Sequence, residues 1–211
     1  MRKVTLLLTV LFVTALYNST PVLAQSSGSF SASFGATQCA ISNNDGTLTG
    51  GIAGTSLPDV TVKVSSGNGV ALVITPSLVT GLYTQNKLNQ LTPTATQNVG
   101  LRVKVLVDNS TAHVVPEIGS NGVVYDQRFI QVNASFLSGL STCLLDCFTM
   151  VQSTLAAHSF NFYVSNLAPG SHTIRVTWDI VGGGTGEGTC VGPGTRTVEQ
   201  VKNFTFNLNP A

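Results

Sequence analysis

Apolar and polar side chains alternate with a period of two along most of this chain. The clearest run has Ile174, Val176, Trp178 and Ile180 alternating with Thr173, Arg175, Thr177 and Asp179. Similar alternation covers residues 30–36, 60–64, 70–75, 99–107, 123–132, 159–164 and 203–208. This period is that of a half-buried β-strand, whose apolar side faces a core. We therefore expect Phe30, Ala32 and Phe34 to point inward from the first strand.

Turn sequences separate these runs at short intervals. They are Asn43-Asn44-Asp45-Gly46, Gly67-Asn68-Gly69, Asp108-Asn109-Ser110, Asn121-Gly122 and Ala168-Pro169-Gly170. Such residues favour tight turns, and no long stretch shows the period of a helix. Nine to eleven strands with this spacing predict an all-β fold. We expect an antiparallel two-sheet β-sandwich, immunoglobulin-like or jelly-roll-like, rather than a closed barrel.

Residues 1–24 have the pattern of a secretory signal peptide. Arg2 and Lys3 give a positive start, residues 4–17 are apolar apart from threonines, and Val22 and Ala24 are the small pair that fits cleavage after residue 24. The apolar run is too short to span a bilayer, so an uncleaved anchor is the weaker alternative. We expect one mature domain, residues 25–211, that is secreted to an extracellular or periplasmic location without stable membrane insertion.

The charge content is low and balanced. Charged residues make up 9% of the chain, well below the usual quarter, whereas 43% of residues are hydrophobic. Ten Lys and Arg oppose nine Asp and Glu, and without Arg2 and Lys3 the balance is eight against nine. No basic cluster is present to replace the counterions of a phosphate backbone, which excludes nucleic acid as a partner.

Four cysteines predict disulfides in an exported chain: Cys39, Cys143, Cys147 and Cys190. We favour a small loop closed by Cys143 and Cys147, with Cys39 after the first strand bonded to Cys190 before the last. The first and last strands of a sandwich often lie close together. Crossed pairings of Cys39 with Cys143 or Cys147 stay open. A zinc site of Cys143, Cys147 and His158 is a further alternative that lacks an evident fourth ligand.

One short segment has a recognisable pattern. Residues 166–176, Asn-Leu-Ala-Pro-Gly-Ser-His-Thr-Ile-Arg-Val, resemble the Leu-x-Pro-Gly-x-Tyr/His turn and strand found late in bacterial immunoglobulin-like and fibronectin-III-like domains. The resemblance covers a small part of the chain. It implies a turn on Pro169-Gly170, a strand packed against the opposite sheet, and a corner role for His172 in hydrogen bonding the backbone. It implies no activity.

Recognisable motifs for catalysis, cofactors or metals do not occur in the sequence. The glycine-rich segment 182–188 lacks the Lys-Ser/Thr of a phosphate-binding loop and fits no G-x-G-x-x-G frame. There is no G-x-S-x-G, H-E-x-x-H or C-x-x-C-H. His158 shares the inward parity of Phe160 and Phe162, which predicts a core histidine at a strand end. We therefore expect no cofactor and no enzymatic activity.

Three acidic residues on or near predicted strands could pair across a cleft as glycosidase carboxylates: Asp126, Asp179 and Glu199. Solvated acids that face Lys or Arg are the simpler interpretation, as for Asp179 near Arg175 on the outward side. Asp45 could bind calcium, but a hairpin turn explains it with nothing extra.

Outward positions of the strands carry hydroxyl and amide groups with few charges. Examples are Ser159, Asn161, Tyr163, Gln131, Asn133, Ser135, Asn203, Thr205 and Asn207. Natural sheets usually protect exposed edges with charged residues, so this surface favours strand addition from a neighbouring molecule. The same groups suit sugar hydroxyls, with Tyr83, Tyr125 or Tyr163 as an aromatic platform.

These observations favour a secreted, non-enzymatic structural, surface or adhesive protein, whose partner is another copy of itself or an extracellular polysaccharide. A carbohydrate-binding module is the second hypothesis and an extracellular hydrolase is the third. A structural subunit predicts concentration-dependent assembly, a lectin predicts a concave face with an exposed aromatic side chain, and a hydrolase predicts acids that converge in a deep pocket.

Overall fold

The computed structural model describes residues 28–66, 70–89, 91–116, 122–133 and 147–202. In these ranges the chain forms strands and no helix: β1 (Phe30–Gly35), β2 (Cys39–Ile41), β3 (Leu48–Gly50), β4 (Val60–Val64), β5 (Ala71–Leu88), β6 (Thr94–Val107), β7 (Val114–Val115), β8 (Val123–Asn133), β9 (Phe148–Ser159), β10 (Phe162–Ser165), β11 (Gly170–Gly182) and β12 (Glu187–Val201). The expected signal peptide and the segment 203–208 lie outside the described residues.

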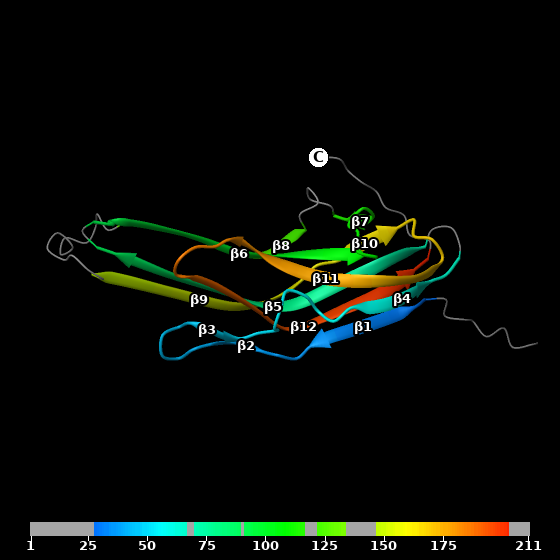
Figure 1. Cartoon of the computed structure of the whole chain (residues 1–211), viewed down its shortest axis with the longest axis horizontal. Helices are drawn as coiled ribbons and strands as arrows, with labels where there is room; N and C mark the ends of the chain where they lie inside the picture. Colours follow the sequence, from blue (N-terminus) through cyan, green and yellow to red (C-terminus); the bar gives the residue numbers. More distant parts are fainter. Residues whose placement is uncertain (1–27, 67–69, 90, 117–121, 134–146, 203–211) are drawn as a thin grey trace, which may run out of the picture.

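Two antiparallel sheets pack against each other, which confirms the predicted sandwich (Figure 1). The large sheet has the order β1-β12-β5-β10-β7, and β9 also pairs with β5. The small sheet has the order β4-β11-β6-β8, while β2 and β3 form a separate hairpin. β5 is central, because β12 lies along one side of it while β10 and then β9 lie along the other.

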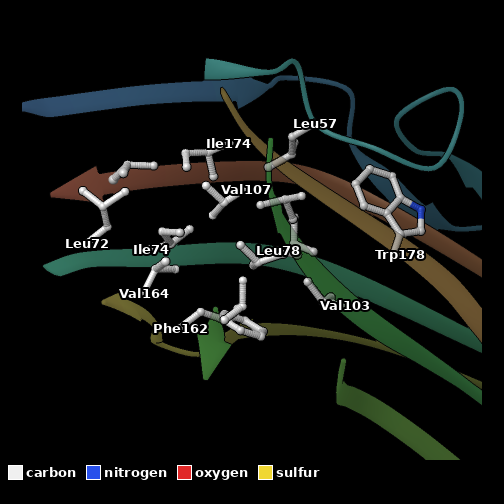
Figure 2. Packing of buried hydrophobic residues seen from close by; sticks show 14 of the residues in the cluster. Leu57, Leu72, Ile74, Leu78, Val103, Val107, Phe162, Val164, Ile174 and Trp178 are labelled. Atoms are coloured by element: carbon white, nitrogen blue, oxygen red, sulfur yellow. The ribbon is translucent and has the colours of Figure 1, made fainter. Parts of the chain in front are cut away.

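An apolar core fills one end of the sandwich, which we call the apolar end. Leu72, Ile74 and Leu78 of β5 are buried there against strands of the small sheet (Figure 2). Other buried members of this cluster are Leu57, Val62, Leu101, Val103, Phe162, Val164, Ile174, Val176 and Val198. Most of these residues come from runs whose alternation the sequence shows directly, whereas Leu57, Leu78 and Val198 lie outside those runs.

The other half of β5 faces a different interior, which we call the polar end. Thr80, Thr84 and Asn86 are fully buried on the same side of the strand as Leu78. At the far tip, Leu88 packs with partly buried apolar residues: Ala95, Val132, Cys147 and Phe148. The sandwich therefore has apolar packing at both extremes and polar side chains between them.

Alternation predicted a strand only over 70–75, whereas β5 runs from Ala71 to Leu88. Proline usually interrupts a strand, but Pro76 lies in a gap between two partners of β5. β10 pairs with β5 up to Ile74, and β9 pairs with β5 from Ser77 onward. A proline removes no ladder hydrogen bond at such a gap. The hydroxyl of Tyr125 donates to the Pro76 carbonyl over 3.0 Å instead.

A hairpin and a disulfide cover the outer face of the large sheet at Gly81. β2 and β3 pair around the predicted turn at 43–46, where the Asp45 carboxylate accepts from the Thr47 amide over 3.1 Å. A Cβ on Gly81 would lie 2.9 Å from the Cys190 sulfur, so only glycine leaves room for the bond beneath the hairpin.

The predicted bond between Cys39 and Cys190 is confirmed. Cys147 is disulfide-bonded too, and its favoured partner Cys143 lies outside the described residues.

Candidate functional site

β1 turns its serines inward and its phenylalanines outward, so the expectation for its parity is wrong. Phe30 and Phe34 are 65% and 72% exposed. Ser31 instead faces inward and donates from its hydroxyl to the Thr61 carbonyl of β4 over 2.8 Å. The inner side of this strand meets backbone carbonyls and the buried Arg196, and buried polar groups need hydrogen-bond partners. Hydroxyls supply these partners and phenyl rings do not.

Arg196 of β12 fixes that arrangement. Its side chain is fully buried, and it donates to the Ile174 carbonyl over 2.8 Å, to the Ser33 hydroxyl over 3.0 Å and to the Pro58 carbonyl. Burial lowers the pKa of its guanidinium to about 10, so it stays protonated at neutral pH. A buried charge requires this set of acceptors, which commits β1 to presenting Ser33 inward.

The outward side of β1 continues a nearly uncharged face of the large sheet. Its pairs with β12 are Phe30 with Glu199, Ala32 with Thr197 and Phe34 with Thr195. A pocket of about 250 Å³ adjoins Thr195 and is lined by Val79, Ala157 and Pro193 among others. Among the described strands β1 is the end of its sheet, and residues 30–34 carry no charge. We call residues 30–34 the β1 edge.

The three tyrosines proposed as sugar platforms lie apart. Tyr125 is buried beneath Pro76, and its burial raises the pKa of its hydroxyl. Tyr83 and Tyr163 both occupy outward positions of the large sheet, but Tyr163 pairs with Val73, ten residues from Tyr83 along β5. That spacing corresponds to about 33 Å. The structure therefore does not combine these rings into one surface.

Two of the residues considered for chemistry meet at the polar end, on the seam between β8 and β9. The register shift in β8 leaves Tyr125 without a partner in β6 and brings Asp126 to the interior side. His158 Nε2 lies 3.6 Å from Asp126 Oδ2, and its ring lies 6.4 Å from that of Tyr125. The Thr80 hydroxyl donates to Asp126 over 3.1 Å.

This pair lacks the third component of a nucleophilic site. His158 Nε2 is the ring nitrogen that faces Asp126, so a nucleophile would have to be bonded to Nδ1. Within the described ranges no serine, threonine or cysteine side chain is hydrogen-bonded to either ring nitrogen of His158. Arg128 crosses the same seam and donates to the Thr154 hydroxyl. The arrangement ties β8 to β9, and sequence parity alone missed it because the two strands are neighbours only through the fold.

Further buried polar atoms at this end have no hydrogen-bond partner. They are Thr84 Oγ1, Asn86 Oδ1 and Nδ2, Arg128 Nη1, His158 Nε2 and Glu187 Oε2. Such atoms are rare in natural interiors because each carries a desolvation cost. Six of the seven such atoms in the described residues lie at the polar end, the seventh being Arg196 Nε, so we expect the polar end to be the less stable half.

The three candidate glycosidase acids do not converge. Asp179 is paired with Arg102, whose hydrogen bond lowers the pKa of that carboxyl, and Lys104 lies 3.6 Å away. Asp126 lies in the seam, and Glu199 lies on β12 beside Phe30. Within the described residues these acids occupy three separate places, and no group of three His, Cys, Asp or Glu side chains is placed to hold a metal ion.

His172 occupies the corner position that the resemblance implies. Its Nδ1 lies 2.7 Å from Asp108 Oδ2, and its Nε2 lies 2.8 Å from the Ala168 carbonyl oxygen. Burial alone would lower the pKa of His172, but the hydrogen bonds to the Ala168 carbonyl and to Asp108 together raise it. When the ring is protonated, both of its nitrogens donate, and the imidazolium then closes the turn before β11.

A second pocket, of about 420 Å³, lies beneath the strap formed by residues 50–55. The Ile52 amide donates to the Val191 carbonyl over 2.7 Å and the Trp178 amide donates to the Thr55 carbonyl over 2.9 Å, so the strap bridges the two sheets. Trp178 lines the pocket together with aliphatic and hydroxyl side chains and the acidic Asp179. Figure 2 shows the ring of Trp178 at the margin of the core. This pocket therefore combines a concave surface with an aromatic ring.

No helix in the described part of the chain is long and apolar enough to cross a membrane. Comparison with known proteins gives no assignment, because no protein-family model matches the chain and no curated protein matches it significantly in sequence.

Proposed function

We propose that this protein is an exported, non-enzymatic structural or surface protein that associates with copies of itself through the β1 edge. The single observation that carries the proposal is the pair of exposed phenylalanines on an uncharged end strand. Burying one phenylalanine side chain contributes about 1.5–3 kcal/mol, and a free edge without charges lacks the usual protection against strand addition. The Cys39–Cys190 disulfide supports export, because such bonds persist mainly in oxidising compartments.

Sedimentation velocity of the purified protein over a concentration series tests the proposal. The average sedimentation coefficient should rise with concentration for the wild type. Phe34→Lys should lower that rise, since it places a charge on the exposed strand. Thr96→Lys is the matched control, because Thr96 is also exposed but belongs to the small sheet, where it pairs with the uncharged Gln131. A wild type that stays monomeric at every concentration would overturn the proposal.

Binding of a small sugar in the Trp178 pocket is a second candidate, supported by the size of the pocket and its aromatic lining. Trp178 is the one tryptophan of the chain, so its fluorescence reports on this pocket directly. A saturable change in emission with an added oligosaccharide, lost when Thr189→Arg fills the pocket, would support this candidate. No change with any neutral oligosaccharide at millimolar concentration would exclude it.

A further inference from the structure

We infer that a second copy of the chain pairs with the β1 edge across a two-fold axis through Ala32. This inference rests on the proposed function and adds the partner, the register and the size of the assembly. It follows from the direction of the free backbone groups, from the sequence of the edge and from the charges around it.

The direction of the backbone groups in β1 is set by its pairing with β12. The Gln200 amide donates to the Ser29 carbonyl over 2.9 Å. Along an antiparallel strand, alternate residues direct both N–H and C=O to the same neighbour. Ser29, Ser31 and Ser33 therefore face β12, and the N–H and C=O groups of Phe30, Ala32 and Phe34 face the free side.

The edge reads Phe-Ser-Ala-Ser-Phe in both directions. A two-fold axis at Ala32 pairs Ala32 with Ala32 of the second copy, and Phe30 with Phe34 of the second copy. Three such hydrogen-bonded pairs exchange about two bonds each, or about six in all, which satisfies every free group of residues 30, 32 and 34. A shift of the register by one residue would place the free N–H and C=O groups of one copy across from residues of the second copy whose N–H and C=O groups are already bonded to β12.

The side chains fit this register. Each outward phenylalanine lies directly across from a phenylalanine of the second copy, and cross-strand aromatic pairs stabilise antiparallel sheets. The inward serines keep their bonds, including that from Ser29 to the Lys63 carbonyl over 2.6 Å. Glu199 would lie across from Thr195 of the second copy, three strand spacings or about 14 Å away, so no like charges meet.

The size of the contact sets the expected behaviour. Five residues per strand form a small interface compared with the roughly 1,200–2,000 Å² of stable complexes, so we expect a reversible dimer seen at high concentration. A two-fold contact uses the same surface on both copies and is closed, so the assembly through this edge stops at two.

Proline substitution separates pairing from folding. Ala32→Pro removes an N–H that faces the free side, a position where edge strands tolerate proline. It should raise the dimer dissociation constant about tenfold or more in sedimentation equilibrium and leave the melting temperature nearly unchanged. Ser33→Pro and Ser33→Ala together test which side of β1 the N–H of residue 33 faces. Both variants lose the hydroxyl that accepts from Arg196, but only the proline variant also loses the N–H that faces β12, so it should melt at a lower temperature than Ser33→Ala.

Cross-linking tests the register. Ala32→Cys should form a covalent dimer under mild oxidation, since hydrogen-bonded antiparallel pairs bring Cα atoms to about 5.5 Å. Thr195→Cys, on the same face one strand further in, should not. A wild type that never associates overturns both this inference and the proposed function. If Ala32→Pro associates as well as the wild type and Ala32→Cys forms no covalent dimer, this inference alone is overturned.

Discussion

The two halves of β5 belong to one continuous strand but face interiors of opposite character. At the apolar end, Leu72, Ile74 and Leu78 pack among aliphatic side chains. At the polar end, Thr80, Thr84 and Asn86 occupy the corresponding inward positions. Backbone pairing continues through both halves, since β9 pairs with β5 from Ser77 to Leu88. A long hydrogen-bonded ladder can therefore extend a sheet beyond the part that an apolar core supports, at the cost of lower local stability.

The largest expected effect comes from the Cys39–Cys190 bond, which lies over Gly81 at the junction of the two halves. It closes a loop of 151 residues, for which the chain-entropy model predicts about 5 kcal/mol of stabilisation. Replacing both cysteines by serine should lower the free energy of unfolding by an amount of this order in urea titrations. The matched control replaces Cys143 and Cys147, whose short predicted loop should contribute about 2 kcal/mol. Equal losses would contradict the prediction.

Leu78→Ala and Leu82→Ala compare the two interiors directly, because both leucines are fully buried and lie four residues apart on β5. Leu78 belongs to the apolar cluster, so its truncation should cost about 3–5 kcal/mol. Leu82 lies between Thr80 and Thr84, where fewer apolar groups surround it, and its truncation should cost about 2 kcal/mol. Chemical denaturation of the two variants measures the difference. If Leu82→Ala costs as much as Leu78→Ala, the polar end is packed as tightly as the apolar end.

Thr84→Val should raise the stability. The hydroxyl of Thr84 is buried without a hydrogen-bond partner, and valine has nearly the same shape without that polar atom. Removing an unpaired buried group should stabilise the fold by about 1 kcal/mol. Thr80→Val is the control, since the Thr80 hydroxyl is bonded to Asp126 and its loss should destabilise. A lower melting temperature for Thr84→Val would show that this hydroxyl has a partner in solution.

The smallest effect should come from pH at the apolar end. The raised pKa of His172 means that its contribution to stability is present below the unfolded value, about 6.5, and is lost as pH rises through the folded value. The hydrogen bond from His172 lowers the pKa of Asp108, so that carboxylate contributes above about 3.9 and its contribution is lost as pH falls through the folded value. Melts of wild type and His172→Ala should therefore differ by about 1 kcal/mol near pH 5.5 and by less near pH 8. A constant difference would rule out this linkage.

Period-two alternation was sufficient to predict the fold class and the strands β4, β6, β8, β10 and β11, because many of their inward residues are aliphatic. It predicted neither β9 nor β12, and the buried Arg196 and Gln200 interrupt the apolar side of β12. It failed at β1, where both faces are uncharged and the buried Arg196, more than 160 residues away in sequence, decides which face turns inward. It also missed the second half of β5, since inward threonine and asparagine look like surface positions. The seam of Asp126 and His158 depends on which strands become neighbours, and local sequence does not carry that information.

The position of the disulfide has a mechanical consequence. β1 is held to β12 by six residue pairs, and Cys39, four residues beyond the end of β1, is covalently joined to Cys190 of the same strand, β12. A pulling force applied at the β1 edge would first be carried by the hydrogen bonds between β1 and β12, all of which share the load. The Cys39–Cys190 bond would then carry the force into β12, the longest of the strands that pair with β5. An assembly joined through β1 would thus transmit tension into the middle of each sandwich without first unravelling the N-terminal strand.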